Sequence, residues 1–318
     1  MLEKSSEEIK SVITEFDNYQ AEVEWDITQR CNYSCSYCES YNNTDPTQFR
    51  TLEEYSKAIE YIKTYFDNKN ARIDILGGEP ILFKQWAELL NKIHEVGLVA
   101  NLTTNLSLNF KTLEKKIEKL KPLNCIDVSW HTQFSDDEKM LKNIKLLYET
   151  GHLRSISILG DKRYWTRVVK AYNDTKFTGI AEISFIKDES AGKKNVANKL
   201  YQYSEEEVKY IRSTTLNHKK VSKTQITYKN GKQEDFFSIQ EFFEKGITNF
   251  MDMKCEIGQL KLHIKQNGDV YPSACFLNHP QARLGNVFKE NVIKPNKPII
   301  CPFSFCGCGS DLRISKYV

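Results

Sequence analysis

Three cysteines lie within eight residues of one another, in the stretch RCNYSCSYCES that covers residues 30–40. They are Cys31, Cys35 and Cys38. With nine cysteines in 318 residues, chance would produce such a triplet in fewer than about one chain in a hundred. Four thiolates complete a structural zinc site or a [4Fe–4S] cluster. Three thiolates leave one iron of such a cluster with an open coordination position, which suits a site that binds and activates a further molecule.

A second group of cysteines lies beyond residue 250. Its members are Cys255, Cys275, Cys301, Cys306 and Cys308, and the last three crowd into CPFSFCGCGSD. Five thiols exceed by one the four that a single [4Fe–4S] cluster needs, and a structural zinc site would use the same residues. The remaining cysteine, Cys125, opens a predicted strand at the end away from the predicted mouth of the fold, so we expect it to serve packing.

The elements that must position these residues repeat along the chain. Six apolar, β-branched runs predict strands, at residues 21–28, 71–76, 98–104, 125–130, 153–159 and 181–186. From the second run onward the starts lie about 27 residues apart, the length of one strand, one helix and two short loops. Such units predict a parallel sheet with right-handed crossovers, which is either doubly wound or curled as a barrel. Because a closed barrel needs eight units, we expect an α/β fold with a partial (β/α)6 barrel that is open on one side.

Local signals mark the helices and the ends of the repeat. Thr51 and Glu54 form a capping-box sequence, and Gly97 and Gly151 follow helix-forming segments. After residue 187 a polar linker begins, followed by a helix and by hairpins with Asn-Gly turns. We therefore expect the following parts: an N-terminal helix at 1–20, the barrel at 21–187, linker helices and a hairpin at 188–250, and a small α+β cysteine module at 251–318.

The overall composition gives no support to a nucleic-acid or membrane-surface partner, although it does not exclude a nucleic-acid substrate. The net charge is +3 with both signs well mixed, so no electrostatic footprint for nucleic acid or an anionic membrane stands out. No run of eighteen apolar residues exists, and the acidic, amphipathic start is not a signal peptide. We expect a cytoplasmic protein, in which thiols stay reduced and clustered cysteines bind metal or act in catalysis.

The stretch CNYSCSYC resembles the signature of the radical S-adenosylmethionine (SAM) superfamily. The resemblance implies that Cys31, Cys35 and Cys38 hold a [4Fe–4S] cluster and that Tyr37 packs near the adenine of SAM. The partial (β/α)6 barrel of that superfamily agrees with the six units counted above.

Further motifs resemble the same superfamily at the ends of the next strands. DILGGEP, at 74–80, is similar to its GGE motif, which holds the amino group of SAM. Two glycines let a backbone approach closely, and carbonyls with a carboxylate suit an ammonium group. A plain strand-ending turn is the alternative for Gly77 to Pro80. TTN at 103–105 ends the third strand as in many members, and Ser129 lies in the fourth; the alternatives are a strand-end Asn and a buried hydroxyl bonded to the backbone. The SAM-binding residues that the resemblance implies here are Gly77, Gly78, Glu79, Pro80, Thr104 and Ser129.

The C-terminal part resembles the auxiliary domain of SPASM/Twitch radical SAM enzymes. A cysteine is followed by a hairpin carrying NGDVYPSAC, then by LGN at 284–286 and a terminal cysteine cluster. The resemblance implies one auxiliary Fe–S cluster, expected to be [4Fe–4S], because the form with two clusters needs about seven or eight cysteines. Cys255 and Cys275 are expected as ligands together with two of Cys301, Cys306 and Cys308.

The mechanism that the resemblance implies is reductive cleavage of SAM to a 5′-deoxyadenosyl radical that removes a hydrogen atom from the substrate. An electron donor such as flavodoxin or ferredoxin would supply the electron for this cleavage, and oxidation or epimerisation of the substrate would follow. Peptide-modifying relatives often carry an N-terminal peptide-binding domain, whereas only about twenty residues precede the first strand. We therefore expect a small-molecule substrate, such as a sugar or an aminocyclitol. The alternatives are a peptide-modifying enzyme, a radical SAM RNA methylase and a structural zinc-binding protein.

Polar residues at the predicted mouth are candidates for contact with the substrate. His131, which follows the fourth strand, is the candidate catalytic residue. Asp161, Lys187 and Tyr271 are further candidates, and for each of them helix capping or solvent exposure is the alternative.

Overall fold

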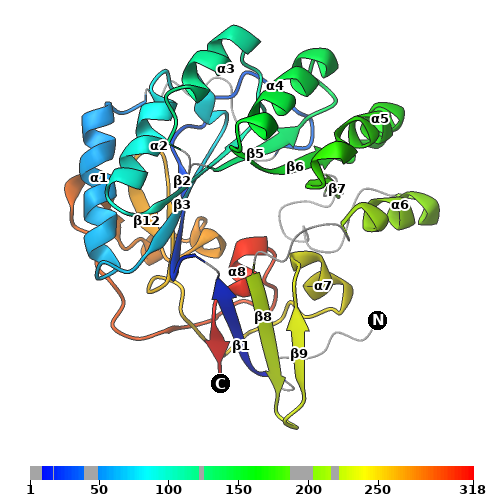
Figure 1. Ribbon diagram of the computed structural model, residues 1–318. Helices are drawn as coiled ribbons and strands as arrows, with labels where there is room; N and C mark the ends of the chain where they lie inside the picture. Colours follow the sequence, from blue (N-terminus) through cyan, green and yellow to red (C-terminus); the bar gives the residue numbers. More distant parts are fainter. Residues whose placement is uncertain (1–8, 17, 39–48, 122–124, 187–202, 216–221) are drawn as a thin grey trace. The chain divides into compact units, whose positions relative to one another are not determined.

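The computed structural model describes residues 9–16, 18–38, 49–121, 125–186, 203–215 and 222–318 (Figure 1). The polar linker that the sequence predicts from residue 187 onward, including Lys187, lies outside the described residues. The chain divides into two compact units. One contains residues 25–56 and 73–219 and is called the barrel unit; the other contains residues 1–24, 57–72 and 220–318 and is called the antiparallel unit.

Alternating strands and helices build the barrel unit. Its strands are β2 (Ala21–Asp26), β3 (Ala71–Leu76), β4 (Val99–Thr104), β5 (Cys125–Trp130), β6 (Leu153–Leu159) and β7 (Ala181–Ser184), of which β2 and β3 begin in the other unit. Its helices are α2 (Trp86–Glu95), α3 (Phe110–Ile117), α4 (Asp137–Glu149), α5 (Trp165–Thr175) and α6 (Glu205–Thr215). Short 3-10 helices are η2 (Pro80–Leu82), η3 (Lys162–Tyr164) and η4 (Lys176–Thr178).

The six strands of this unit are neighbours in chain order, from β2 to β7. The pairs β4–β5, β5–β6 and β6–β7 are parallel. Among the described residues these strands belong to a nine-stranded sheet in the order β13-β12-β11-β2-β3-β4-β5-β6-β7, whose two edges do not meet. The predicted α/β fold with a partial barrel is therefore confirmed. Parallel strands leave all their carboxyl ends at one edge, where loops can bring functional groups together.

Local sequence accounts for the helices that cover the strands. Thr51 and Glu54 cap α1 (Leu52–Tyr65): the Glu54 amide donates to the Thr51 hydroxyl at 3.2 Å and the Thr51 amide donates to the Glu54 carboxylate at 2.9 Å. The carboxylate of Asp136 accepts from the Lys139 amide at the start of α4. Gly97 and Gly151 have φ of 78° and 73° after α2 and α4, the left-handed geometry expected of helix-ending glycines.

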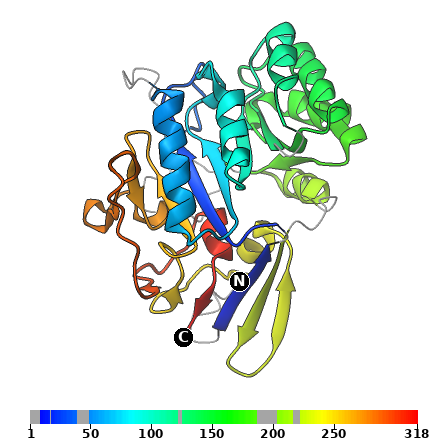
Figure 2. The same ribbon diagram turned by 60° about the vertical axis from the view of Figure 1, so that its left-hand side comes forward.

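The antiparallel unit contains a six-stranded sheet in the order β14-β10-β15-β1-β8-β9, with antiparallel neighbours throughout. These strands are β1 (Ile9–Phe16), β8 (Ser222–Tyr228), β9 (Gln233–Phe236), β10 (Lys254–Cys255), β14 (Ile299–Ile300) and β15 (Lys316–Tyr317). Figure 2 shows β8 and β9 side by side as a hairpin. The remaining elements are α7 (Ile239–Glu244), α8 (Gly309–Arg313), β11 (Lys261–Ile264), β12 (Asp269–Tyr271), β13 (Gly285–Asn286), η6 (Ala274–Phe276), η7 (Pro280–Ala282) and η8 (Val287–Lys289).

The predicted N-terminal helix is wrong for Ile9–Phe16, which form β1 between β8 and β15. The register of β1 against β8 shifts between Ile9 and Ser11, and this irregularity lets both Ile9 and Val12 enter the core. Two buried apolar residues three positions apart, here Ile9 and Val12, have the spacing expected of a helix, although this backbone is extended. Pairing with two strands distant in sequence decided the outcome.

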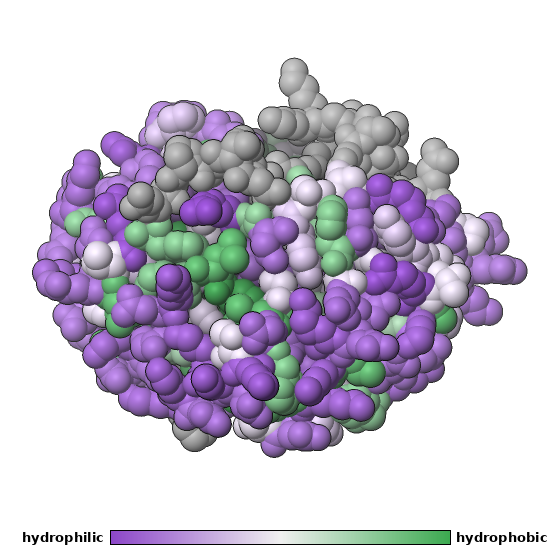
Figure 3. Space-filling model, turned by 90° about the horizontal axis from the view of Figure 1, so that it is seen from above, coloured by the Kyte–Doolittle hydropathy of each residue, from purple (hydrophilic) through white to green (hydrophobic). Residues whose placement is uncertain are grey.

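Hydrophilic residues cover most of the face seen in Figure 3, and hydrophobic residues gather in one area of it. None of the helices in the described part of the chain combines the length and the apolar composition that crossing a bilayer needs.

Candidate functional site

The first cysteine group lies on the loop that follows β2. Cys31, Cys35 and Cys38 are half-buried, and the amide of Cys38 donates to the carbonyl of Cys35 at 3.0 Å. Burial raises the pKa of the Cys31 thiol and that of Cys35 to about 11. A four-iron cluster places each thiolate on a different iron, so the three sulfurs do not have to converge on one point. Among the described residues, no three His, Cys, Asp or Glu side chains do so.

The Gly-Gly pair at the end of β3 packs directly on this loop. The amide of Gly78 donates to the Thr28 carbonyl and the amide of Glu79 donates to the Arg30 carbonyl, both at 2.8 Å. A Cβ on Gly77, where φ is 121°, would lie 2.2 Å from the Thr28 oxygen, and one on Gly78 would lie 2.1 Å from the Arg30 oxygen. The close backbone approach predicted for these glycines is therefore made to the cysteine loop itself.

The Glu79 carboxylate joins the ends of β3 and β4. It is 1% exposed and accepts from the Thr104 hydroxyl and the Asn105 amide, each at 2.6 Å, and from the Ile81 amide at 3.2 Å. Burial raises the pKa of Glu79 to about 7, although these three donors lower it. Pro80, at the first position of η2, is buried beside it. Both Glu79 oxygens thus bind the chain's own donors, which holds the strand-end motif rigid.

Asn105 connects this strand end to the cysteine loop, and the sequence did not single it out. Its side-chain amide donates to the Asn32 side-chain oxygen at 2.9 Å and lies 3.9 Å from the Cys31 sulfur. The Asn32 amide in turn donates to the Ser107 hydroxyl at 2.9 Å. A strand-end TTN stretch was the only signal available, because these partners are 73 and 75 residues apart in the chain.

Tyr37 and His131 come together at the same edge. The Tyr37 hydroxyl lies 2.9 Å from Nδ1 of His131, and their rings stack at 5.9 Å with an angle of 14°. Burial lowers the pKa of His131 to about 4, so the imidazole is neutral near pH 7. A neutral imidazole carries one donor and one acceptor nitrogen, so it can move a proton at the second nitrogen.

Two further side chains hold the cysteine loop from β5 and β6. The Ser36 amide donates to the Gln133 side-chain oxygen at 3.1 Å, and Arg163 donates to Asp161 and to the Ser36 hydroxyl. Asp161 is fully buried and also accepts from the Arg163 amide at the start of η3. Asp161 therefore acts here as a cap and an anchor for Arg163, the alternative foreseen for it.

Alternate residues of β5, β6 and β7 point to opposite faces of the sheet. One face is apolar and packs in the core, and the other, called the inner face, carries many polar side chains. Polar residues hold six positions of this half-buried face, and Cys125, Leu153 and Leu159 hold its other positions; the polar residues are Asp127, Ser129, Ser155, Ser157, Glu182 and Ser184. The residues between them are buried and apolar: Ile126, Val128, Trp130, Ile156, Ile158, Ala181 and Ile183. The Ser157 and Ser184 hydroxyls lie 2.6 Å apart. The structure thus places Ser129 in a row of hydroxyl groups.

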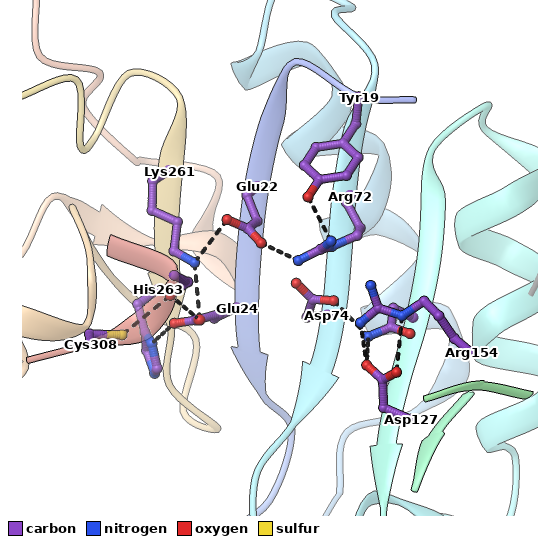
Figure 4. A network of polar contacts seen from close by, with 12 residues as sticks. Tyr19, Glu22, Glu24, Arg72, Asp74, Asp127, Arg154, Lys261, His263 and Cys308 are labelled. Carbon is purple, nitrogen blue, oxygen red and sulfur yellow. Dashed lines mark hydrogen bonds and ion pairs between the residues drawn. The ribbon is translucent and has the colours of Figure 1, made fainter. Parts of the chain in front are cut away.

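A polar network closes one end of that inner face. The Asn101 amide donates to Asp74 at 2.8 Å and to Asp127 at 2.9 Å. Asp127 also pairs with Arg154 and accepts from the Ser155 hydroxyl at 2.6 Å (Figure 4). The Arg154 guanidinium and these hydrogen bonds lower the pKa of Asp127 despite its burial, so this carboxylate is ionised at neutral pH.

The second cysteine group lies in the antiparallel unit, around α8 and β15. Cys301 and Cys306 belong to an apolar cluster, and Cys255 belongs to another on which Cys275 packs. Cys308 has polar surroundings: its sulfur is 3.2 Å from the Ser310 hydroxyl, which donates to Glu24 at 2.5 Å. Glu24 also pairs with Lys261 at 3.1 Å and with His263 at 3.2 Å (Figure 4).

The thiols of this group fit an iron–sulfur cluster by their chemistry and their environment. Burial raises the pKa of all five thiols, and the Asp311 carboxylate raises each of them further. Asp311 is 2% exposed, and its Oδ1 atom has no hydrogen-bond partner among the described residues. Tyr271 is buried in β12 of the same unit, where the Lys265 ammonium lies 4.9 Å from its ring, so its candidacy for substrate contact stays a prediction.

Comparisons with known proteins agree with this arrangement. Residues 25–191 match the family described as "Radical SAM superfamily". A GTP 3′,8-cyclase of Helicobacter pylori is 29% identical over 164 residues, which are 49% of this chain and 49% of that protein. An S-adenosylmethionine-dependent nucleotide dehydratase of Fibrobacter sp. is 34% identical over 91 residues, which are 26% of each chain. The chain thus spans about half the length, or less, of these curated relatives.

A likeness of fold reaches further along the chain. The crystal structure of Streptococcus suis SuiB bound to the precursor peptide SuiA superposes with a TM-score of 0.58 at 18% identity, covering 87% of this chain and 64% of that chain. The shared fold therefore extends well beyond residues 25–191. Since the family match covers more than half of the 318 residues and includes the cysteine loop, the strand end packed on it and β4 to β7, the chain belongs to the radical SAM superfamily, whose members bind SAM and a [4Fe–4S] cluster.

Proposed function

We propose that this chain is a radical SAM enzyme that oxidises or epimerises a small, polar, hydroxyl-bearing molecule such as a sugar or an aminocyclitol. The observation that carries the substrate class is the row of hydroxyls on the inner face of β5 to β7. Parallel barrels are ordinarily filled by Val, Ile and Leu. Here Ser129, Ser155, Ser157 and Ser184 occupy that face and are half-buried.

Serine hydroxyls suit such a substrate because each can both donate and accept a hydrogen bond, as sugar hydroxyls do. The charged groups beside them favour a substrate without phosphate. Arg154 is paired with Asp127, and Glu182 adds a further acidic side chain to the same face. Phosphate recognition calls for arginines, lysines or helix N-termini directed at the ligand.

The residues of the site take the following proposed roles. Cys31, Cys35 and Cys38 hold the [4Fe–4S] cluster, Tyr37 lies beside the adenine, and the backbone around Gly77 and Gly78 receives the amino group of SAM. Glu79 supports that backbone through Thr104 and Asn105, and Ser129 contacts SAM from β5. When bound, the cluster and SAM supply a 5′-deoxyadenosyl radical that removes a hydrogen atom from the substrate.

His131 is the proposed proton-handling residue of the site. It is neutral near pH 7, and its Nδ1 atom faces the Tyr37 hydroxyl at 2.9 Å, which leaves Nε2 to accept or donate a proton. The proposed second group of ligands, Cys255 and Cys275 with two of Cys301, Cys306 and Cys308, holds one auxiliary Fe–S cluster. Such a cluster gives an oxidation a place to deposit the second electron.

Two alternative substrate classes have support of their own. A peptide is supported by the fold shared with SuiB, whose crystal structure holds a precursor peptide. A nucleotide is supported by the names of the two curated relatives, a GTP 3′,8-cyclase and a nucleotide dehydratase. The ribose of a nucleotide would also suit the hydroxyl row, but the acidic side chains of Asp127 and Glu182 on the same face disfavour its phosphates.

SAM cleavage tests the site. Anaerobic, reduced protein should convert SAM to 5′-deoxyadenosine, and Cys31→Ala, Cys35→Ala and Cys38→Ala should each abolish this, whereas Cys125→Ala should not. Cleavage that persists in all three variants would contradict the assignment. Iron and sulfide analysis separates this site from a zinc site, and about eight irons per chain would support two clusters.

Deuterium transfer tests the substrate class. Panels of C-deuterated sugars and aminocyclitols, nucleotides and short peptides are incubated with the enzyme, and 5′-deoxyadenosine is analysed by mass spectrometry. We expect deuterium only from the first panel. A product that has lost two hydrogens indicates oxidation, whereas one that has gained a solvent hydrogen at the same carbon indicates epimerisation. Transfer from the nucleotides or peptides alone would overturn the proposed class.

A further inference from the structure

A lysine lies fully inside the antiparallel unit, next to the second cysteine group. Lys316, on β15, is 1% exposed. Its ammonium donates to three backbone carbonyls, those of Asp311 at 2.6 Å, Ile314 at 2.8 Å and Leu312 at 3.2 Å. Its three N–H groups are thus satisfied by neutral acceptors. Hydrogen bonds to carbonyls do not remove the net charge, and a buried charge is costly unless an opposite charge lies nearby.

A second buried lysine of the same unit shows the usual solution. Lys261 is also fully buried, and its ammonium pairs with the carboxylates of Glu24 at 3.1 Å and Glu22 at 3.5 Å. Lys316 forms no such ion pair among the described residues. Asp311 meets Lys316 through its backbone carbonyl, and the Phe250 ring centre lies 4.8 Å from the ammonium. Among the described residues, the positive charge of Lys316 therefore has no carboxylate as an ion-pair partner.

Cysteines of the second group neighbour Lys316 in the sheet. Cys255, on β10, is the direct cross-strand partner of Lys316 on β15. Cys301 follows β14, which pairs with β10 on its other side, and its amide donates to the Met253 carbonyl at 2.9 Å. Strand pairing therefore places two of the five candidate ligands, Cys255 and Cys301, close to Lys316 in this sheet.

We propose that the buried ammonium of Lys316 is the counter-charge of the auxiliary iron–sulfur centre. The inference rests on the proposed function, which places a thiolate-bound cluster among these cysteines. Thiolates bound to iron are anionic, and together with the cluster they supply the negative charge that the surroundings of Lys316 lack. A fixed positive charge beside a cluster stabilises its reduced, more negative form, so Lys316 raises the reduction potential of the auxiliary centre.

The test uses the full chain carrying Cys31→Ala, Cys35→Ala and Cys38→Ala, so that any remaining iron belongs to the second cysteine group. In this background, Lys316→Gln removes the charge but keeps an N–H donor, and Lys316→Arg keeps the charge. Lys254→Gln is the matched control, because Lys254 is an exposed lysine on the neighbouring strand β10. The readouts are iron content, the midpoint potential from an EPR-monitored titration, and the melting temperature of the iron-free protein.

We expect Lys316→Gln to lower the midpoint potential by at least 59 mV, a tenfold change in the ratio of reduced to oxidised centres for one electron. Lys316→Arg should restore most of this shift, and Lys254→Gln should cause none. Without iron, Lys316→Gln should melt at a higher temperature than its parent, because it removes an uncompensated buried charge. A purely structural lysine would instead make the iron-free variant less stable.

Three results would overturn the proposal. If Lys316→Gln binds iron and has the same midpoint potential as the Lys254→Gln control, Lys316 is not the counter-charge, although the auxiliary centre exists. An iron-free Lys316→Gln variant that melts lower or does not fold would show a structural role instead. A background protein that binds no iron would overturn the auxiliary centre and, with it, the role of Lys316.

Discussion

The Tyr37 hydroxyl and Nδ1 of His131 lie 2.9 Å apart with their rings stacked, although 94 residues separate them in the chain. Tyr37 belongs to the cysteine loop after β2, and His131 follows β5. The contact therefore links the loop that carries the cluster ligands to the edge of the inner face where the substrate is proposed to bind.

The neutral state of His131 predicts a pH dependence of stability. Burial lowers its pKa from 6.5 to about 4, so between these values the unfolded chain binds a proton that the folded chain does not. This contribution is complete above pH 6.5 and is lost as the pH falls toward about 4. In this window the unfolding free energy of His131→Gln should fall by on the order of 1–3 kcal/mol less than that of the parent. Anaerobic urea unfolding between pH 4 and 7 measures it, with His94→Gln as control; equal slopes in both variants would contradict the prediction.

Glu79 should give the opposite slope. Its pKa is raised from 4.5 to about 7, so its contribution is complete below pH 4.5 and is lost as the pH rises through about 7. The Glu79→Gln side chain cannot ionise. Between pH 5 and pH 8 the unfolding free energy of this variant should therefore fall by on the order of 2–3 kcal/mol less than that of the parent. Exposed Glu149→Gln is the control. Unfolding free energies at the two pH values decide the point, and a parent protein that is equally stable at both would speak against it.

The glycine pair offers a test of the cysteine loop's position. Alanine at Gly78 would place its Cβ 2.1 Å from the Arg30 oxygen, whereas at Gly151, with φ of 73°, the added Cβ meets nothing within 4 Å. We expect Gly78→Ala to cost about 2–4 kcal/mol and to lower iron binding at Cys31, Cys35 and Cys38. Gly151→Ala should cost about 1 kcal/mol, from the strained backbone alone, and should retain iron. Equal iron contents in the two variants would show that the contact does not position the loop.

Asp127 should contribute more to the stability of the fold than a surface carboxylate does, because it belongs to the inner-face network. Asp127→Asn would weaken the pair with Arg154 and the bonds to Asn101 and Ser155, at an expected cost of about 1–3 kcal/mol for this partly buried pair. The matched control is Asp174→Asn, which breaks the surface i,i+4 pair with Lys170 and should cost much less, because solvent screens such a pair. Thermal unfolding of the two variants compares them. A similar cost for both would mean that the network adds nothing to the fold.

Much of this site could be predicted from local sequence because its signals are local. The spacing of Cys31, Cys35 and Cys38, the strand-ending Gly77 and Gly78, and the regular strand–helix repeat all depend on residues close together in the chain. Hydrophobic period, turn glycines and capping sequences arise from short-range sterics and hydrogen bonds, which the sequence shows directly. The repeat therefore led to the parallel strands β2 to β7 and to the edge at which they end.

Tertiary structure decided what depends on contacts between distant residues. The sequence indicated Glu79 as a ligand for an ammonium group, but only the fold shows its oxygens bound to Thr104 and Asn105. Arg163 and Gln133 carried no local signal, and Asn105 only that of the strand-end TTN stretch, because each acts through a partner on another strand or loop. The strand at Ile9–Phe16 was missed for the same reason, since its neighbours β8 and β15 lie more than two hundred residues away.

The sequence by itself therefore determined the family, the strand–helix repeat and the thiols available for iron. Only the folded chain decided which charges are paired, and this separates Lys261, with its two glutamates, from Lys316, which has carbonyls and thiols around it. The physical reason is that the cost of a buried charge depends on its three-dimensional surroundings, which residue type and spacing do not specify.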